Sequence, residues 1–454
     1  MNPAMTQRAL AQEQIFRTWW PLAASWMLMG LELPALSAVV ARLAHPEIHL
    51  AAYGGVVFPV ALLIESPIIM LLAASTALSR DWASYLKIRR FMMIAGAGLT
   101  LLHVALAFTP LYDLVLVRLL NPPPEIIEPA RLGLMLMLPW TWAIAYRRFH
   151  QGVLIRAGQS NAVGLGTVVR LSANILVLAV GYSLQTLPGI VVATSAVSAG
   201  VLSEALYVGW RVRPALEALK RAPALAESLT WRAFAHFYLP LVMTSLLTLL
   251  ALPLGSAGMS RMPQALASLA IWPALSGILF LLRSVGIAYT EVVVALLEHP
   301  RAVESLRRFA YKIAAVTTLV PLLVAVTPLG ELWFAQVSGL PAGLATLAQT
   351  ALGLGFLVPG FTVLQSFFQG TLMHDRRTRG ITEAVALSLL TSALILSVGV
   401  VWGGLAGVYV AQIAFVIGAA VQTLWLWRGS RSALRTLEQR ERSQTRAVAS
   451  ELVC

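Results

Sequence analysis

Six ionisable side chains lie within long apolar stretches of this sequence, namely Glu32, Glu65, Arg170, Glu204, Arg283 and Glu291. A charged group is costly in hydrocarbon and is usually kept there for a function. A buried carboxylate can exchange a proton when its surroundings change, and a buried guanidinium can bind an anion or a carboxylate. These residue types therefore predict coupled movement of charged solutes.

Glu32 stands two residues before Pro34. A proline removes one backbone hydrogen bond from a helix and allows a kink. A carboxylate beside a kink can act as a protonation switch, because neutralising it removes a desolvation cost and can reset the bend. We predict a proton- or ion-coupling role for Glu32 and a hinge at Pro34. The alternative is an inert carboxyl group, protonated or hydrogen-bonded to a neighbouring helix.

Glu65 and Arg283 occupy matching positions in the two halves of the chain. They are expected to close a cavity as a charge pair or to present opposite charges to a substrate, and Glu65 is a second coupling candidate. A static bridge within one lobe is the alternative. Four residues follow one another at helical spacing, namely Ser276, Arg283, Gly286 and Thr290. This spacing places them on one helix face. This polar stripe predicts a cavity lining.

The other candidate residues are predicted from their position in apolar segments. Arg170, Glu204 and Glu291 are further candidates for the substrate cavity. Arg147 and Arg148 lie toward the end of a predicted helix, where they are expected to attract an anion to the inner mouth. The alternative for these arginines is that they extend to lipid headgroups.

The composition decides the class of protein. The chain has 454 residues, of which 58% are hydrophobic and 12% are charged. Soluble proteins have about 45–50% apolar and about 25% charged residues, so a soluble enzyme is excluded. The net charge of +13 would suggest a nucleic-acid partner only in a soluble protein. We therefore expect an all-α polytopic membrane protein that binds lipids and no nucleic acid.

Twelve membrane-spanning helices are predicted. Their approximate ranges are 19–40, 50–78, 91–111, 132–149, 163–184, 190–210, 234–255, 266–297, 310–333, 344–371, 383–401 and 405–427. With the N-terminus in the cytoplasm, 27 of the 33 Lys and Arg residues fall on the cytoplasmic side, four on the other side and two inside helices. This bias predicts that both termini are cytoplasmic.

The two halves of the chain read as a parallel repeat. Pro21, Pro34 and Arg42 recur in the second half, with the same spacing, as Pro240, Pro253 and Arg261. By this match Pro253 is a second predicted hinge. The repeat predicts a first lobe over 1–210, a cytoplasmic linker over 211–231, a second lobe over 232–428 and a basic cytoplasmic tail over 429–454. Two six-helix lobes of equal orientation are typical of transporters.

Motifs for other chemistry are missing from the sequence. It contains no GxxxxGK[ST] phosphate-binding loop and no HExxH zinc motif, and its histidines are scattered. The single cysteine, Cys454, can form no intrachain disulfide. We therefore expect no cofactor, no metal site and no enzymatic activity, and transport driven by a gradient or a partner.

Several segments resemble the progressive ankylosis transporter family. They are RTWWPL at 17–22, EIHLAAYG at 47–54, IESPIIMLL at 64–72 with the following Arg80-Asp81, and HFYLPL at 236–241. That family is allied to the multidrug and toxin extrusion (MATE) carriers and to the lipid and polysaccharide flippases. The resemblance implies twelve helices in two V-shaped lobes around a central cavity. It also implies an alternating-access exporter.

The resemblance implies more than one substrate class. The progressive ankylosis family implies anions such as pyrophosphate, nucleotide phosphates and citrate-like carboxylates. MATE carriers imply organic cations exchanged for protons or sodium, with Glu32 similar to their helix 1 carboxylate, which is usually Asp. A lipid-linked flippase is a third alternative. We expect an anion exporter, acting as a monomer on a small-molecule substrate in a bacterial plasma membrane.

Overall fold

The computed structural model describes residues 10–451 apart from 224–228, 298, 300–301, 376 and 378, and no side chain is described at 438 or 440–451. The secondary structure of this part is helical throughout. Eleven helical segments in it are long and apolar enough to cross a membrane. An all-helical membrane protein is thus confirmed, and the twelfth span stays a prediction. The part of the predicted linker at 224–228 and the last three residues lie outside the described residues.

The described part of the first half contains twelve α-helices and two π-helices. In order they are α1 (Gln12–Gly30), α2 (Glu32–Val40), α3 (Pro46–Ala52), η2 (Tyr53–Val57), α4 (Phe58–Ile69), α5 (Leu71–Leu78), α6 (Trp82–Phe108), η3 (Tyr112–Val117), α7 (Arg118–Leu120), α8 (Pro124–Leu136), α9 (Leu138–Arg156), α10 (Ser160–Leu184), α11 (Gly189–Arg211) and α12 (Arg213–Arg221). The segments α3 to α5 together form one long span.

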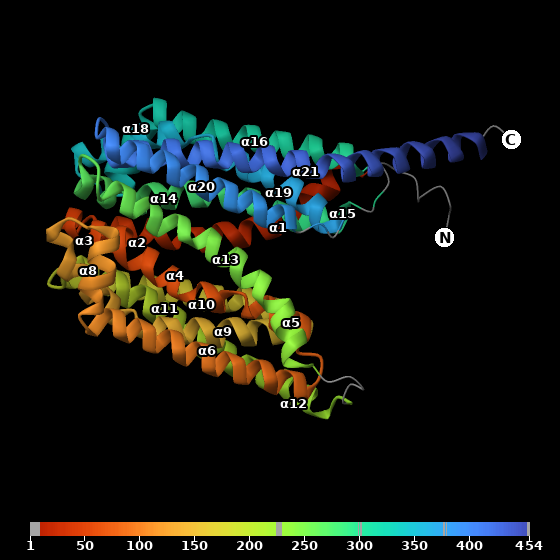
Figure 1. Cartoon of the computed structure of the whole chain (residues 1–454), viewed down its shortest axis with the longest axis horizontal. Helices are drawn as coiled ribbons and strands as arrows, with labels where there is room; N and C mark the ends of the chain where they lie inside the picture. The colour runs from red at the N-terminus through yellow and green to blue at the C-terminus, as the bar shows by residue number, and fades with distance from the viewer. Residues whose placement is uncertain are drawn as a thin grey trace.

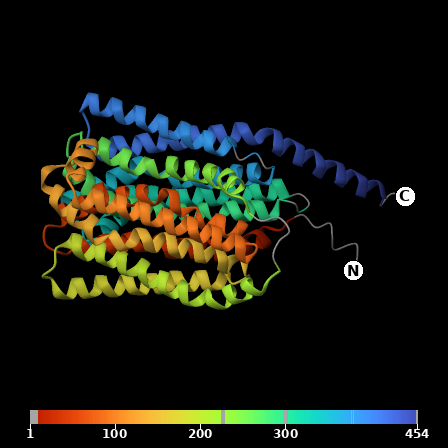
Figure 2. The ribbon, with the colours of Figure 1, turned by 60° about the horizontal axis from the view of Figure 1, so that its bottom comes forward.

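The second half contains nine α-helices and one π-helix among its described residues. They are α13 (Trp231–Met259), α14 (Ala265–Ile287), α15 (Tyr289–Leu296), α16 (Ala302–Val326), α17 (Leu329–Glu331), η4 (Leu332–Val337), α18 (Ala342–Gly355), α19 (Val358–His374), α20 (Arg379–Trp402) and α21 (Gly407–Glu451). The end of α21 projects beyond the other helices in both views (Figures 1 and 2). The predicted basic tail is therefore a continuation of the last helix as far as residue 451.

The first span is interrupted at Leu31, where α1 ends and α2 begins. Pro34 has no N–H with which to bond the carbonyl group of Gly30, so the hydrogen-bond ladder is broken there. Pro253 differs, because it lies inside the continuous helix α13. Pro34 thus interrupts the first span, whereas Pro253 is accommodated within α13.

The predicted span over 132–149 is divided between α8 and α9 at Met137. Pro139 stands near the start of α9 and cannot donate a hydrogen bond to the preceding turn. This segment also carries Arg147 and Arg148, and it is not among the eleven apolar spans.

The helices form two bundles that meet at one end and diverge toward the end that carries the termini (Figure 1). The lower bundle in Figure 1 contains α3 to α12, and the upper bundle contains α14 to α21. Two helices do not stay with their own half of the sequence. α1 packs mainly against α14, α15 and α16, while α13 crosses to pack against α4. The bundles are therefore linked by one helix from each half.

The bundles share a hydrophobic core at the end where they meet. One cluster of buried side chains runs from Leu36 and Val57 in the first half to Leu275 and Phe334 in the second. α3 packs closely on α14 there, and a Cβ atom on Gly54 would overlap the ring of Pro273. Burial of apolar surface across both halves holds this end closed.

Left-handed backbone conformations recur with the spacing of the predicted repeat. The pairs of residues with positive φ are His45 and Gln264, Asn121 and Gly339, and Gln185 and Gly403. Each pair is separated along the chain by the same interval, to within one position, as Pro34 and Pro253. The helix boundaries thus carry the spacing that the prolines and arginines show in the sequence.

Candidate functional site

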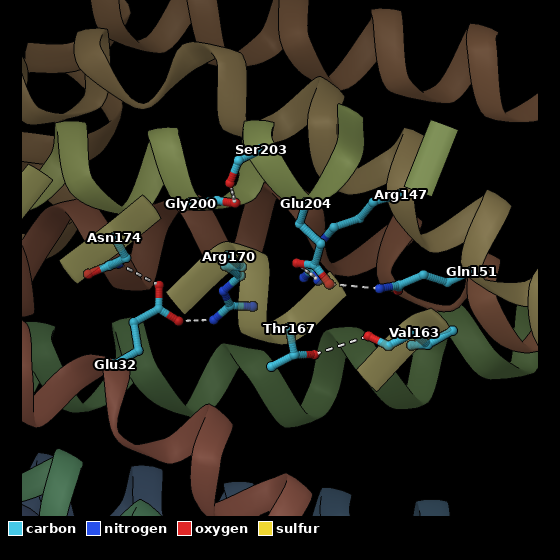
Figure 3. Close-up of polar contacts among 10 residues, drawn as sticks. All are labelled: Glu32, Arg147, Gln151, Val163, Thr167, Arg170, Asn174, Gly200, Ser203 and Glu204. Atoms are coloured by element: carbon cyan, nitrogen blue, oxygen red, sulfur yellow. Dashed lines mark hydrogen bonds and ion pairs between the residues drawn. The ribbon is translucent and has the colours of Figure 1, made fainter. Parts of the chain in front are cut away.

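A buried ion pair joins α9 to α11. Arg147 donates from Nη1 to Oε2 of Glu204 at 2.5 Å, and Gln151 donates from Nε2 to Oε1 of the same carboxylate at 2.8 Å (Figure 3). Arg147 and Gln151 stand four residues apart on α9, so they reach the carboxylate from one helix face. Glu204 is fully buried. Both of its oxygen atoms are therefore occupied inside the protein.

A second ion pair joins α2 to α10 beside the interruption of the first span. Glu32 is the first residue of α2, and its Oε2 atom contacts Nη2 of Arg170. Asn174, one turn further along α10, donates from Nδ2 to Oε1 of Glu32 at 3.1 Å (Figure 3). The side chains of Glu32 and Arg170 are each 12% exposed. The carboxylate at the break in the helix is thus held by a neighbouring helix.

Glu65 lies buried in α4, and its Oε2 atom has no hydrogen-bond partner among the described residues. Arg147 and Arg148 interact with it electrostatically. Three carboxylates and three guanidinium groups therefore gather in the first half of the chain. We call Glu32, Glu65, Arg147, Arg148, Arg170 and Glu204 the first-half charge cluster. With every member ionised, its charges balance.

Arg283 has a different environment on α14. It donates from Nε to the hydroxyl group of Thr362 on α19, at 3.1 Å. The two helices approach closely here, since a Cβ atom on Gly286 would come within 3.0 Å of Val363. No ion pair within the described part of the chain includes Arg283. The second half thus carries a half-buried cation that is bonded to a neutral group.

The structure brings together six of the predicted site residues and separates the others from them. Glu65 lies with Arg147 and Arg148, so in this conformation it does not pair with Arg283. Ser276 and Thr290 are half-buried, and Glu291 is exposed. These residues lie on two helices: Ser276 and Arg283 are on α14, whereas Thr290 and Glu291 are on α15, after the break at Ala288.

The two predicted hinge prolines lie in different surroundings. Pro34 packs against α14, where a Cβ atom on Gly277 would lie 2.9 Å from its Cδ atom. Pro253 is buried within α13. The first proline therefore stands at a contact between the halves as well as beside a helix break.

Three polar partners were not predicted as site residues. Asn174 and Gln151 bind the carboxylates of the first-half charge cluster, and Thr362 binds Arg283. Amide side chains in apolar helices are the signal that could have identified two of these partners. Among the described residues, no group of three or more His, Cys, Asp or Glu side chains could hold a metal ion.

Comparison with known proteins identifies the fold. No family model matches the sequence, and no curated protein matches it. An inward-facing multidrug resistance MATE family transporter of the MOP superfamily has a TM-score of 0.72 and 16% identity, over 92% of this chain and 99% of that one. The lipid II flippase MurJ in an inward closed conformation has a TM-score of 0.67 and 13% identity, over 93% and 90%.

A second MATE structure shares this fold. An outward-facing conformation of a multidrug resistance MATE family transporter has a TM-score of 0.60 and 15% identity, over 95% of this chain and 99% of that one. At this level of identity the likeness concerns the fold, and the chain has the two-bundle fold of MATE transporters and of MurJ.

Proposed function

We propose that this protein is a secondary-active, alternating-access transporter that exports small organic or phosphorylated anions. The observation that carries the proposal is the difference in charge between the two halves. The first-half charge cluster is internally balanced, whereas the one hydrogen bond of the Arg283 side chain to a described residue goes to a hydroxyl group. An unpaired guanidinium at membrane depth costs about 2.5–3.5 kcal/mol, and a bound anion would offset that cost.

Pyrophosphate, nucleotide phosphates and citrate-like carboxylates are the candidate substrates. Each offers oxygen atoms to the guanidinium group of Arg283, whose planar fork suits phosphate and carboxylate groups. Ser276 on the same helix and Thr290 and Glu291 beyond it are further candidates for the path of the substrate. Arg147 and Arg148 would attract anions to its inner mouth.

Glu32 and Glu65 are the proposed coupling residues. Protonation of Glu32 would remove the charge that holds Arg170 and would release α2 from α10, directly beside the break at Leu31. Pro34 keeps this break open, because it cannot restore the missing hydrogen bond. Glu65 has an oxygen atom without a hydrogen-bond partner within the described part of the chain, so it can take up a proton without losing a bond there.

The same proposal includes the topology. Twelve spans in two parallel repeats would place both termini and the diverging end of the bundles in the cytoplasm. The lobes would extend over 1–210 and 232–428, with the linker and the tail on the cytoplasmic side. We propose a monomer in a bacterial plasma membrane, and that α1 and α13 link the lobes as they rock, since each packs against helices of the other half.

Transport by purified protein tests this function. Proteoliposomes should show counterflow of labelled citrate, pyrophosphate or ATP above the level of empty vesicles. Arg283→Ala should abolish the signal, and Arg283→Lys should retain part of it because the charge remains. Arg308→Ala is the matched control, since Arg308 is exposed and pairs with Glu304 on the surface. Equal counterflow in Arg283→Ala and in the control would remove Arg283 from the binding site.

A proton- or sodium-coupled exporter of organic cations is the second candidate. The position of Glu32 beside Pro34 and the structural likeness to a multidrug transporter favour it. It predicts that expression lowers the accumulation of cationic dyes and that Glu32→Gln removes the effect. Dye accumulation that is the same with and without the protein would exclude this candidate. A lipid-linked flippase remains a third candidate, supported by the likeness to MurJ.

A further inference from the structure

Arg42 connects the first half of the chain to the second. It follows α2, and its Nη1 atom donates to the carbonyl oxygen of Ala38 at 2.6 Å. Its Nη2 atom donates to the carbonyl oxygen of Gln336, in η4 of the other half. The guanidinium group lies against Gly339, since a Cβ atom there would be 2.6 Å from Nη1. Gly339 also has a φ of +71°, which favours glycine.

Arg261 makes the corresponding connection in the opposite direction. It follows α13, and its Nη1 atom donates to the carbonyl oxygen of Ala257 at 2.7 Å. From the same guanidinium group, bonds of 2.8, 3.2 and 3.3 Å reach the carbonyl oxygens of Leu119, Leu120 and Arg118. These carbonyl groups end α7, where they lack helical partners and carry negative partial charge. A cation is favourable at such a position.

The two connections are equivalent. Arg42 and Arg261 occupy matching positions of the repeat, and so do the acceptors Arg118 and Gln336. Each arginine binds a carbonyl of its own helix and reaches into the other half. Asn121 and Gly339, both with positive φ, turn the chain away after the acceptors. The pair therefore forms two reciprocal contacts between the halves.

These arginines are also exceptions in the charge distribution. Only four Lys or Arg residues fall on the predicted non-cytoplasmic side, namely Arg42, Arg118, Arg131 and Arg261. Arg42 and Arg261 bond across the halves, and Arg131 donates from Nε to the carbonyl oxygen of Ala107 at 3.1 Å. Three of the four positive charges that oppose the topology bias thus make side-chain hydrogen bonds to backbone carbonyl groups.

We propose that Arg42 and Arg261 are two latches that hold the bundles together at the end opposite the termini. This inference rests on the proposed alternating access, because the opposite state must open this end. Opening would separate Arg42 from Gln336, and Arg261 from the end of α7. The guanidinium groups are exposed, so water can replace the lost bonds and the latches can open reversibly. Their function is to bias the protein toward the state open at the termini.

The separation of the bundles at the latched end can be measured directly. Spin labels at Glu125→Cys on α8 and Gly343→Cys on α18, in a Cys454→Ser background, report the distance between the bundles by pulsed electron resonance. Both positions are exposed, and a Cβ atom at Gly343 would meet nothing within 4 Å. Arg42→Ala and Arg261→Ala should each increase the ratio of open to closed molecules roughly 5-fold, and the double variant roughly 25-fold.

Matched controls separate the latch from general damage. Arg118→Ala removes the same charge at the same end, but the side chain of Arg118 makes no bond within the described residues. Gly339→Ala should open the end without removing any charge, by displacing the guanidinium group of Arg42. Gly403→Ala is its control, since Gly403 also has a positive φ, of +62°, and an added Cβ would meet nothing within 4 Å.

The results support or overturn the proposal without reference to substrate. Longer distances in the arginine variants and in Gly339→Ala, with wild-type distances in both controls, would support the latches. Wild-type distances in the double variant would overturn them, as would equal opening in Arg118→Ala. A double variant that fails to fold leaves Gly339→Ala against Gly403→Ala as the deciding pair, and equal distances in those two would overturn the proposal. Transport assays decide the substrate separately.

Discussion

Removing the charge of Glu204 should destabilise the first bundle, because it leaves Arg147 buried without its carboxylate. The substitution Glu204→Gln keeps the shape of the side chain and removes its charge. Breaking a buried ion pair from one side costs about 3–5 kcal/mol. Glu65 lies close enough to Arg147 to act on it electrostatically and has an oxygen atom without a hydrogen bond among the described residues. We therefore expect a loss near the lower end, about 3 kcal/mol.

Thermal unfolding in detergent measures this loss. A lobe of about 200 residues changes its Tm by about 2–4 °C for each kcal/mol, so Glu204→Gln should unfold about 6–12 °C below the wild type. Glu304→Gln is the matched control, because Glu304 pairs with Arg308 at 2.9 Å on the surface, where their side chains are 68% and 64% exposed. Its Tm should stay within about 2 °C of the wild type.

A double-mutant cycle tests the physical reason. Arg147→Gln alone should also destabilise, because Gln151 is then the one hydrogen-bond partner left to the buried carboxylate of Glu204 among the described residues. The double variant Arg147→Gln with Glu204→Gln should be more stable than either single variant, since no unpaired charge remains. If the double variant is no more stable than the less stable of the two single variants, the losses of stability do not arise from an unpaired charge. That result would refute the reasoning.

Two further predictions concern packing and the helix break. Gly152→Ala should lower the Tm by several degrees, because its Cβ atom would lie 2.6 Å from Ser75, whereas Gly98→Ala, which meets nothing within 4 Å, should stabilise by about 0.5–1 kcal/mol. An equal Tm for the two variants would contradict the packing at α9. Pro34→Ala should restore the hydrogen bond to Gly30 and slow counterflow without loss of stability, and wild-type counterflow rates would argue against a hinge at this proline.

The charges and the helix break near Glu32 were readable from the sequence, but their partners were not. Glu32, Arg170 and Glu204 stood out because a charge in an apolar run is rare. That Arg147 binds Glu204 depends on how α9 and α11 are rotated toward each other, over 57 residues of sequence. The pairing of Glu65 with Arg283, suggested by their matching positions, does not occur in this conformation.

The prolines, too, predicted the helix breaks only in part. Pro34 and Pro253 occupy matching positions, yet only the first span is interrupted. A missing N–H weakens a helix locally, and its neighbours decide whether the helix breaks. Pro139 near the start of α9 could have indicated the division at Met137, which the prediction of a single span over 132–149 did not include.

Membrane class and helical content follow from the sequence alone, because hydrophobicity and the charge bias of loops are sums over neighbouring residues. The constant spacing between matching residues of the two halves was likewise visible in the chain itself. The tertiary structure decided that α1 and α13 cross between the bundles and that Arg42 and Arg261 bind across the halves. It also decided that the first half balances its buried charges, while Arg283 donates a hydrogen bond to the neutral hydroxyl group of Thr362. Such contacts depend on helix rotation and close approach between distant segments, which no local pattern encodes.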